Sequence, residues 1–186
     1  MHRPSEATGE DREAAASEIC EAVVRAARAL APAGTLRLVL QHVALRGEGE
    51  RPGRLRLLDA VMDVSGNLVP LRLWPERGPR TVEGSALEEA VAALDAMIFA
   101  REGLSGYTLR IDADGGSDLH LRTGEALPAA LLAPGCAGGE IHDGRHQIQH
   151  HADELEELRE RRSAPQGGRL RRLLGTMTSR LERIRR

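Results

Sequence analysis

The stretch of sequence that decides the fold reads TLRLVLQHVAL and covers residues 35–45. Its alternate residues Leu36, Leu38 and Leu40 are apolar, which is the two-residue period of a β-strand with one buried face. The stretch YTLRIDADG, residues 107–115, shows the same alternation and then ends in a Gly-containing turn. These two stretches predict strands of one sheet.

Working outward from these stretches, the sequence predicts further strands and two helices with apolar stripes of helical period. Because the strands come in hairpins and do not alternate singly with helices, the pattern favours an antiparallel sheet. We expect an α+β fold of order α-β-β-β-α-β-β with about five strands, two packing helices and a C-terminal helical extension. The expected elements are helices at 12–30 and 86–101 and strands at 35–45, 54–64, 68–74, 107–113 and about 119–121.

Local signals refine these boundaries. The sequence Ser-Gly-Asn at 65–67 predicts a hairpin turn, and Pro70 predicts an edge strand or a bulge, because proline has no N–H to donate. Ser85 and Glu88 form a capping-box pattern that predicts a helix start at Ala86.

The rest of the chain is predicted to flank this α+β domain. Residues 123–143 are rich in Gly, Ala and Pro and have no clear period, which indicates a linker. Helical patterns return at 146–162 and 169–186. The predicted organisation is therefore a flexible N-terminus at 1–11, the α+β domain at 12–122, the linker at 123–143 and a basic helical tail at 144–186.

Composition excludes several classes of protein. A chain of 186 residues buries enough surface for one ordinary domain. Aromatic residues make up 2%, too few for a base-stacking platform, so nucleic acid ranks last among the partners. The sequence has no apolar run long enough to span a bilayer and no secretory signal, which predicts a cytoplasmic protein.

Charge is unevenly distributed, although the net charge is -2. Residues 159–186 contain ten arginines and two acidic residues, a charge of +8, which leaves -10 on the remainder. The predicted tail helix carries an apolar stripe of helical period that must be buried on the chain itself, on a second copy or on a partner. An acidic protein and an anionic membrane surface are the partners considered first. The stripe consists of Leu170, Leu173, Leu174, Met177, Leu181 and Ile184, and the basic face of Arg171, Arg172, Arg180 and Arg183.

Histidines form the other candidate site. His142, His146 and His150 recur at four-residue spacing, which places them on one face of a helix, where they could hold zinc if further ligands converge. The alternative is a polar, solvated start of a helix. The chain has no GxGxxG, P-loop or GxSxG pattern, so we expect a non-enzymatic protein without a cofactor.

The order of elements from about residue 12 to 122 resembles the YezG-like family of small immunity proteins from bacterial polymorphic toxin systems. The matching segments are Glu13–Leu30, Leu36–Trp74, Ala86–Arg101 and Tyr107–Arg122, and Tyr107–Gly115 carries the closest local likeness. The resemblance implies a protein that binds and blocks a toxin without catalysis of its own. It assigns no individual site residue.

The expected function is therefore a protein-binding module, with an immunity or antitoxin role as the first hypothesis. An acidic body suits capture of a basic toxin, because complementary charge accelerates association and selects partners. Two alternatives stay open: an assembly adaptor that acts through the amphipathic tail, and a metal-dependent enzyme that uses the histidines at 142–151.

Overall fold

The stretch at 35–45 is the central strand of the protein. In the computed structural model, which describes residues 9–46, 53–74, 82–129 and 141–163, β1 (Thr35–Arg46) pairs antiparallel with β2 on one side and β4 on the other. The strand order is β3-β2-β1-β4-β5, and the short β6 continues the sheet in parallel beside the end of β1. The other elements are α1 (Gly9–Ala29), β2 (Gly53–Val64), β3 (Asn67–Arg72), α2 (Val82–Phe99), β4 (Leu104–Asp112), β5 (Ser117–Thr123), β6 (Leu127–Pro128), α3 (Gly144–His150) and α4 (Ala152–Ser163).

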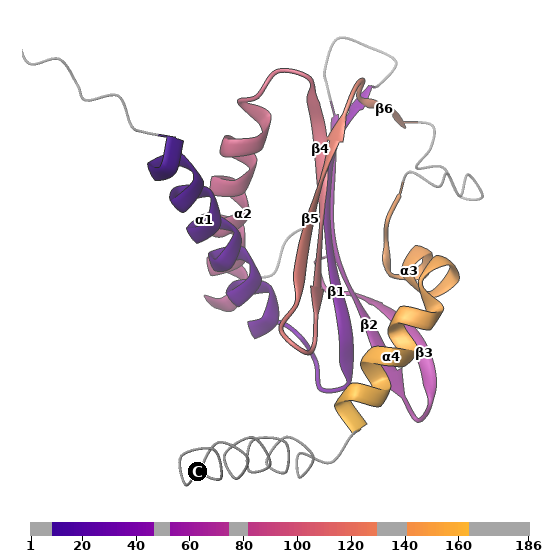
Figure 1. Cartoon of the computed structure of the whole chain (residues 1–186). Helices are drawn as coiled ribbons and strands as arrows, with labels where there is room; N and C mark the ends of the chain where they lie inside the picture. Colours follow the sequence, from indigo (N-terminus) through magenta and orange to yellow (C-terminus); the bar gives the residue numbers. More distant parts are fainter. Residues whose placement is uncertain (1–8, 47–52, 75–81, 130–140, 164–186) are drawn as a thin grey trace, which may run out of the picture.

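Helices α1 and α2 cover one face of this sheet, and the predicted α+β class with an antiparallel sheet is confirmed (Figure 1). Alternate residues of the strands face the helices because of the pleat. Each fully buried leucine contributes about 1.5–3 kcal/mol, so this core is the main source of stability. Its largest contributors include Leu38, Leu40, Leu58, Leu87, Val91, Leu94, Ile98, Leu109 and Ile111.

The hairpin between β2 and β3 forms at the predicted turn. Ser65 and Gly66 both have positive φ, at 54° and 85°, as a two-residue type I′ turn requires. The strand that follows, β3, lies at the edge of the sheet, which confirms the position predicted from Pro70. Helix α2, in contrast, begins at Val82 and not at Ala86, so Ser85 lies inside it and is not its N-cap. A single helical glycine at position 84 costs about 1 kcal/mol, which the packing of α2 exceeds.

The side chain of Leu36 does not face the same side of the sheet as Leu38 and Leu40, contrary to the prediction. A β-bulge interrupts the pairing of β1 with β2 between Thr35 and Arg37. Because a bulge adds a residue, it shifts the alternation at that point, and Leu36 packs with Val61 on the opposite face from Leu38 and Leu40.

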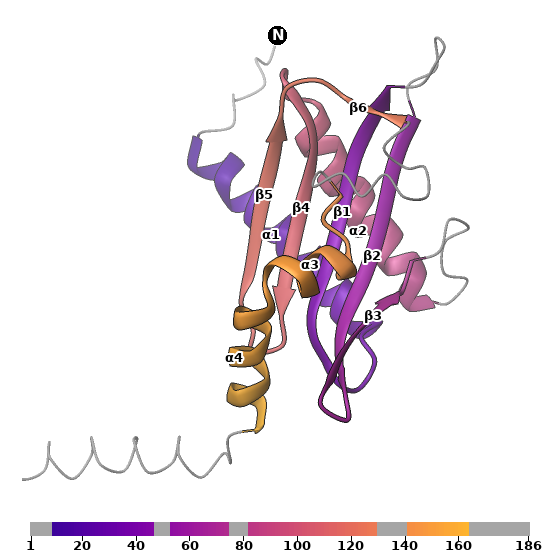
Figure 2. The same ribbon diagram turned by 90° about the vertical axis from the view of Figure 1, so that its right-hand side faces the viewer.

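The second face of the sheet is covered by the segment that the sequence analysis placed in a separate tail. The helix expected at 146–162 is two helices, α3 and α4, that meet at His151, and α4 lies against β1 (Figure 2). Leu155 and Leu158 of α4 are buried with Leu36 and Val61. Residues 141–163 therefore pack in one body with the described parts of 9–129, and the remainder of the predicted tail lies outside the described residues.

The bend at His151 has a clear local basis. The His151 N–H donates to the Gln147 carbonyl at 2.9 Å, and its own carbonyl accepts from the Leu155 N–H at 3.1 Å. The backbone is thus satisfied through the bend while both helices keep contact with the sheet. None of the helices in the described part of the chain is long and apolar enough to cross a membrane.

Candidate functional site

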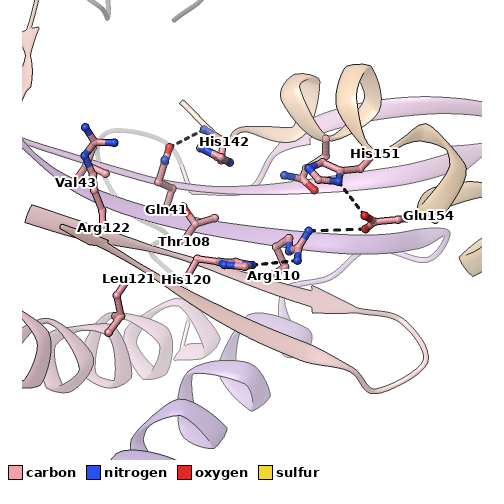
Figure 3. A pocket seen from close by; sticks show the side chains of 11 residues that line it. Gln41, Val43, Thr108, Arg110, His120, Leu121, Arg122, His142, His151 and Glu154 are labelled. Carbon is pink, nitrogen blue, oxygen red and sulfur yellow. Dashed lines mark hydrogen bonds and ion pairs between the residues drawn. The ribbon is translucent and has the colours of Figure 1, made fainter. Parts of the chain in front are cut away.

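A pocket of about 560 Å³ opens on the second face of the sheet, between β1, β4 and β5 on one side and α3 and α4 on the other (Figure 3). Its floor is built by cross-strand pairing: Gln41 pairs with Thr108, and Thr108 pairs with His120, so the three side chains form one row across the strands. Gln41 is 2% exposed and accepts a hydrogen bond from the His142 N–H at 3.1 Å. The other described lining residues are Val43, Arg110, Leu121, Arg122, Gln147, His151 and Glu154.

Arg37 organises the end of this pocket nearest α4. It is 3% exposed, and its Nε donates to Asp112 Oδ1 at 2.6 Å. Its two terminal nitrogens reach Gln147 Oε1 at 3.1 Å and Glu154 Oε2 at 2.9 Å. Burial alone lowers the pKa of Arg37, but the Asp112 and Glu154 carboxylates raise it above its usual value. One buried cation therefore ties β1 to β4, α3 and α4.

Glu154 has two hydrogen-bonding neighbours, and Arg110 forms a longer ion pair with it at 3.8 Å. His151 Nδ1 is 3.0 Å from its Oε1, and Arg37 donates to its Oε2. The hydrogen bond to His151 and the one from Arg37 hold the pKa of Glu154 below its ordinary value, against an opposing effect of burial. Glu154 is thus a carboxylate at neutral pH whose charge is already engaged.

A second ion-pair group borders the pocket on β4 and β5. Arg110 donates to Asp118 Oδ2 at 2.8 Å, and His120 Nε2 is 2.7 Å from the same oxygen. The hydrogen bond from Arg110 lowers the pKa of Asp118, with a further contribution from His120. Cross-strand pairing explains the arrangement, because Arg110 and Asp118 lie directly opposite each other.

The predicted histidine cluster forms, but not as one helical face. His142 precedes α3, whose N-cap is Asp143, while His146 and His150 lie within the helix. The ring centroids are 4.4 Å apart for His142 and His146, and 4.5 Å for His146 and His150. Burial and then the neighbouring histidines lower the pKa of His146. In the part of the chain that the structure describes, no group of three or more His, Cys, Asp or Glu side chains is placed to hold a metal ion.

The sequence analysis missed a buried polar cluster on the helix-covered face. Asp95 of α2 accepts hydrogen bonds from His42 Nδ1 at 2.5 Å, Tyr107 Oη at 2.9 Å and Arg56 at 2.6 Å. Two signals could have revealed it. His42 follows Leu38 and Leu40 at the same two-residue spacing, so its side chain points to the same core. Asp95 lies on the apolar side of α2.

The apolar stripe and basic face predicted for the tail, residues 170–184, lie outside the described residues and stay predictions. Comparison with known protein families and with characterised proteins finds no match for this sequence.

Proposed function

We propose that the protein is a non-catalytic binding module that neutralises a bacterial toxin in the cytoplasm, as an immunity protein does. The element order from α1 to β5 is α-β-β-β-α-β-β, the order on which the resemblance to YezG-like immunity proteins rests. This agreement supports the proposal at the level of the fold.

The observation that carries the proposal is the difference between the two edges of the sheet. At the β3 edge, Pro70 lacks a donor, and α3 packs so closely that a Cβ on Gly144 would lie 3.0 Å from the Pro70 ring. At the opposite edge, β5 has seven residues and no proline, and among the described strands it pairs only with β4. An open edge of this kind can pair with an extended segment of another protein.

Side chains beside the β5 edge favour a basic partner. Leu121 of β5 is 43% exposed and offers an apolar contact. Helix α4 is tied to the β4–β5 turn by the ion pair of Arg161 with Asp114. Asp153, Glu157 and Glu160 are exposed on this helix, as are Arg162 and the paired Arg161. Complementary charge of this sign would speed the association with a basic toxin.

The test is co-expression with a toxin domain encoded beside the gene, with cell growth and the affinity of the purified pair as readouts. Leu121→Asp should abolish protection. Val64→Asp is the matched control, because Val64 is 47% exposed but lies at the end of β2, next to the β2–β3 turn. Equal protection by the two variants would refute the β5 edge as the interface, and the lack of any binding by the wild type would refute the immunity function.

A further inference from the structure

The hairpin of β2 and β3 exposes an apolar surface close to its turn. Val64, Val69 and Leu71 are 47%, 39% and 41% exposed, and they are three of the four exposed large apolar side chains in the described part of the chain. Val69 pairs with Met62, Val64 follows Met62 at two-residue spacing, and Leu71 pairs with Ala60. Met62 and Ala60 pack in the core under α1 and α2, so the three exposed side chains lie on the same face of the sheet. The two helices leave this part of their face, which we call the hairpin surface, uncovered.

The described part of the chain ends beside this surface. Arg159 of α4 donates to the Gly66 carbonyl at 2.9 Å. Arg162, in the last turn of the same helix, donates to the Thr35 carbonyl at 3.2 Å. Gly66 is in the turn of the hairpin, two residues from Val64, and the end of α4 lies at the same end of the molecule as this turn in both views (Figures 1 and 2). The sequence that follows α4 therefore starts close to the hairpin surface.

The sequence beyond α4 supplies an apolar face of matching length. The stripe predicted at 170–184 contains six large apolar side chains, and their burial is strongly favourable. As a helix, this stripe is about 21 Å long. Residues 164–169 precede it and can span about 20 Å when extended. Leu71 lies five residues beyond Gly66, about 17 Å along β3. The stripe can therefore reach the whole hairpin surface.

Charge and connectivity favour the tail of the same chain as the occupant of this surface. Residues 164–186 contain seven arginines and one acidic residue, a charge of +6, which leaves -8 on the remainder. The basic tail is attracted to this acidic remainder, and the tails of two copies repel each other. A short connection to α4 also gives the tail an effective concentration at the hairpin surface of about millimolar. A second copy or a separate partner must bind without this advantage.

We propose that residues 169–186 cover the hairpin surface of the same chain. The stripe packs on Val64, Val69 and Leu71, and the basic face of the tail stays in contact with water. The contact closes the end of the sheet beside the β2–β3 turn, at the opposite edge from β5. It is therefore independent of the proposed toxin binding, which uses the outer edge of β5.

The test is NMR of the full-length protein with a nitroxide attached at Ser179→Cys. Position 179 lies opposite the stripe on the predicted helix, and Cys20→Ala with Cys136→Ala removes the two native thiols. The same sample with the nitroxide reduced is the reference. We expect the nitroxide to broaden the methyl signals of the hairpin surface beyond detection. The methyl signals of Leu127, which pairs with the far end of β1, should not change.

Val69→Lys combined with Leu71→Lys is the decisive variant. Lysine is common on edge strands, so the fold should persist, but the two charges remove the apolar contact and repel the basic tail. We expect the broadening of the Val64 methyl signals to be lost. Leu121→Lys, at a position that is 43% exposed on the opposite edge, is the matched control and should keep this broadening.

A mixed sample separates the same chain from a second copy. It contains nitroxide-bearing chains without isotopes and isotope-labelled chains without nitroxide, and we expect no broadening in it. Broadening in the mixed sample equal to that in the doubly labelled chain would assign the surface to a second copy and overturn the proposal. So would sharp hairpin signals in the doubly labelled chain, which would leave the surface to another partner, or equal broadening in the lysine variant and its control. The first two measurements keep the native hairpin surface, so they decide the matter even if the lysine variant does not fold.

Discussion

Replacement of Asp95 by alanine should be among the most destabilising single changes in the described part of the chain. Asp95 is 6% exposed and joins α2 to three strands through His42, Arg56 and Tyr107. Its removal leaves the Tyr107 hydroxyl and the His42 ring buried without their acceptor. An unsatisfied buried group costs about 1–3 kcal/mol, whereas Arg56 is partly exposed and can return to water. The two groups together cost about 2–6 kcal/mol, which agrees with the usual cost of about 3–5 kcal/mol for breaking a buried charged pair.

Urea denaturation at neutral pH measures this loss directly. Glu89→Ala, an exposed change on the same helix, is the matched control and should alter the free energy of unfolding by about 0.5 kcal/mol or less. Asp95→Asn keeps an acceptor for Tyr107 but loses the charge that faces Arg56, so it should lie between wild type and Asp95→Ala.

The same cluster predicts how stability depends on pH. Burial alone raises the pKa of Asp95, but His42, Tyr107 and Arg56 together lower it below its ordinary value of 3.8. The unfolded chain therefore binds this proton more readily, so the stabilisation is complete above that value and is lost as the pH falls through the folded-state pKa. The stability difference between wild type and Asp95→Asn should shrink below about pH 4. A loss under about 1 kcal/mol in Asp95→Ala, or a difference that acid leaves unchanged, would refute this reasoning.

Three further predictions test the packing of the sheet and the tail. Gly106→Ala should lower the free energy of unfolding by about 1–3 kcal/mol, because its Cβ would meet the His42 carbonyl oxygen at 2.5 Å. The control, Gly116→Ala, has its nearest contact at 3.5 Å and should be close to neutral in the same melting experiment. Leu155→Ala should cost about 2–5 kcal/mol in chemical denaturation, because Leu155 is fully buried against the sheet, and an unchanged midpoint would contradict the assignment of α4 to the core. Leu173→Asp combined with Met177→Asp should lower the melting temperature or change the oligomer size, and the predicted role of the tail stripe fails if both, together with partner binding, stay the same.

The strands were predictable because each carries its signal locally. Alternation at 35–45 and 107–115, with the turn at 65–66, was sufficient for an antiparallel sheet. The bulge at Leu36 was not predictable, because it depends on the register of β1 against β2, which is a long-range property. A helix was predicted at 146–162, but the packing of α4 on the sheet was not predictable, because its sequence is mostly charged and its buried apolar residues are only Leu155 and Leu158.

The residues of the candidate pocket were not predictable for the same reason, because long-range strand pairing brings them together. Gln41, Thr108 and His120 are far apart in sequence and become neighbours only through the pairing of three strands. A sequence read one strand at a time shows each of them as a polar residue on a solvated face. The histidines at 142–150 were predicted as a candidate site because their spacing is a local pattern. Gln147, in the middle of the same segment, is not part of any periodic pattern.

Arg37 explains why this polar face is nevertheless well ordered. A lone buried cation would be expensive, but two carboxylates and one amide oxygen surround it, and each comes from a different element. An apolar residue at position 37 could fill the same volume, yet it would remove the hydrogen bond to Gln147 and the ion pair with Glu154, which join β1 to α3 and α4. The buried charge therefore contributes less to net stability than to the choice of one arrangement of α3 and α4 on the sheet.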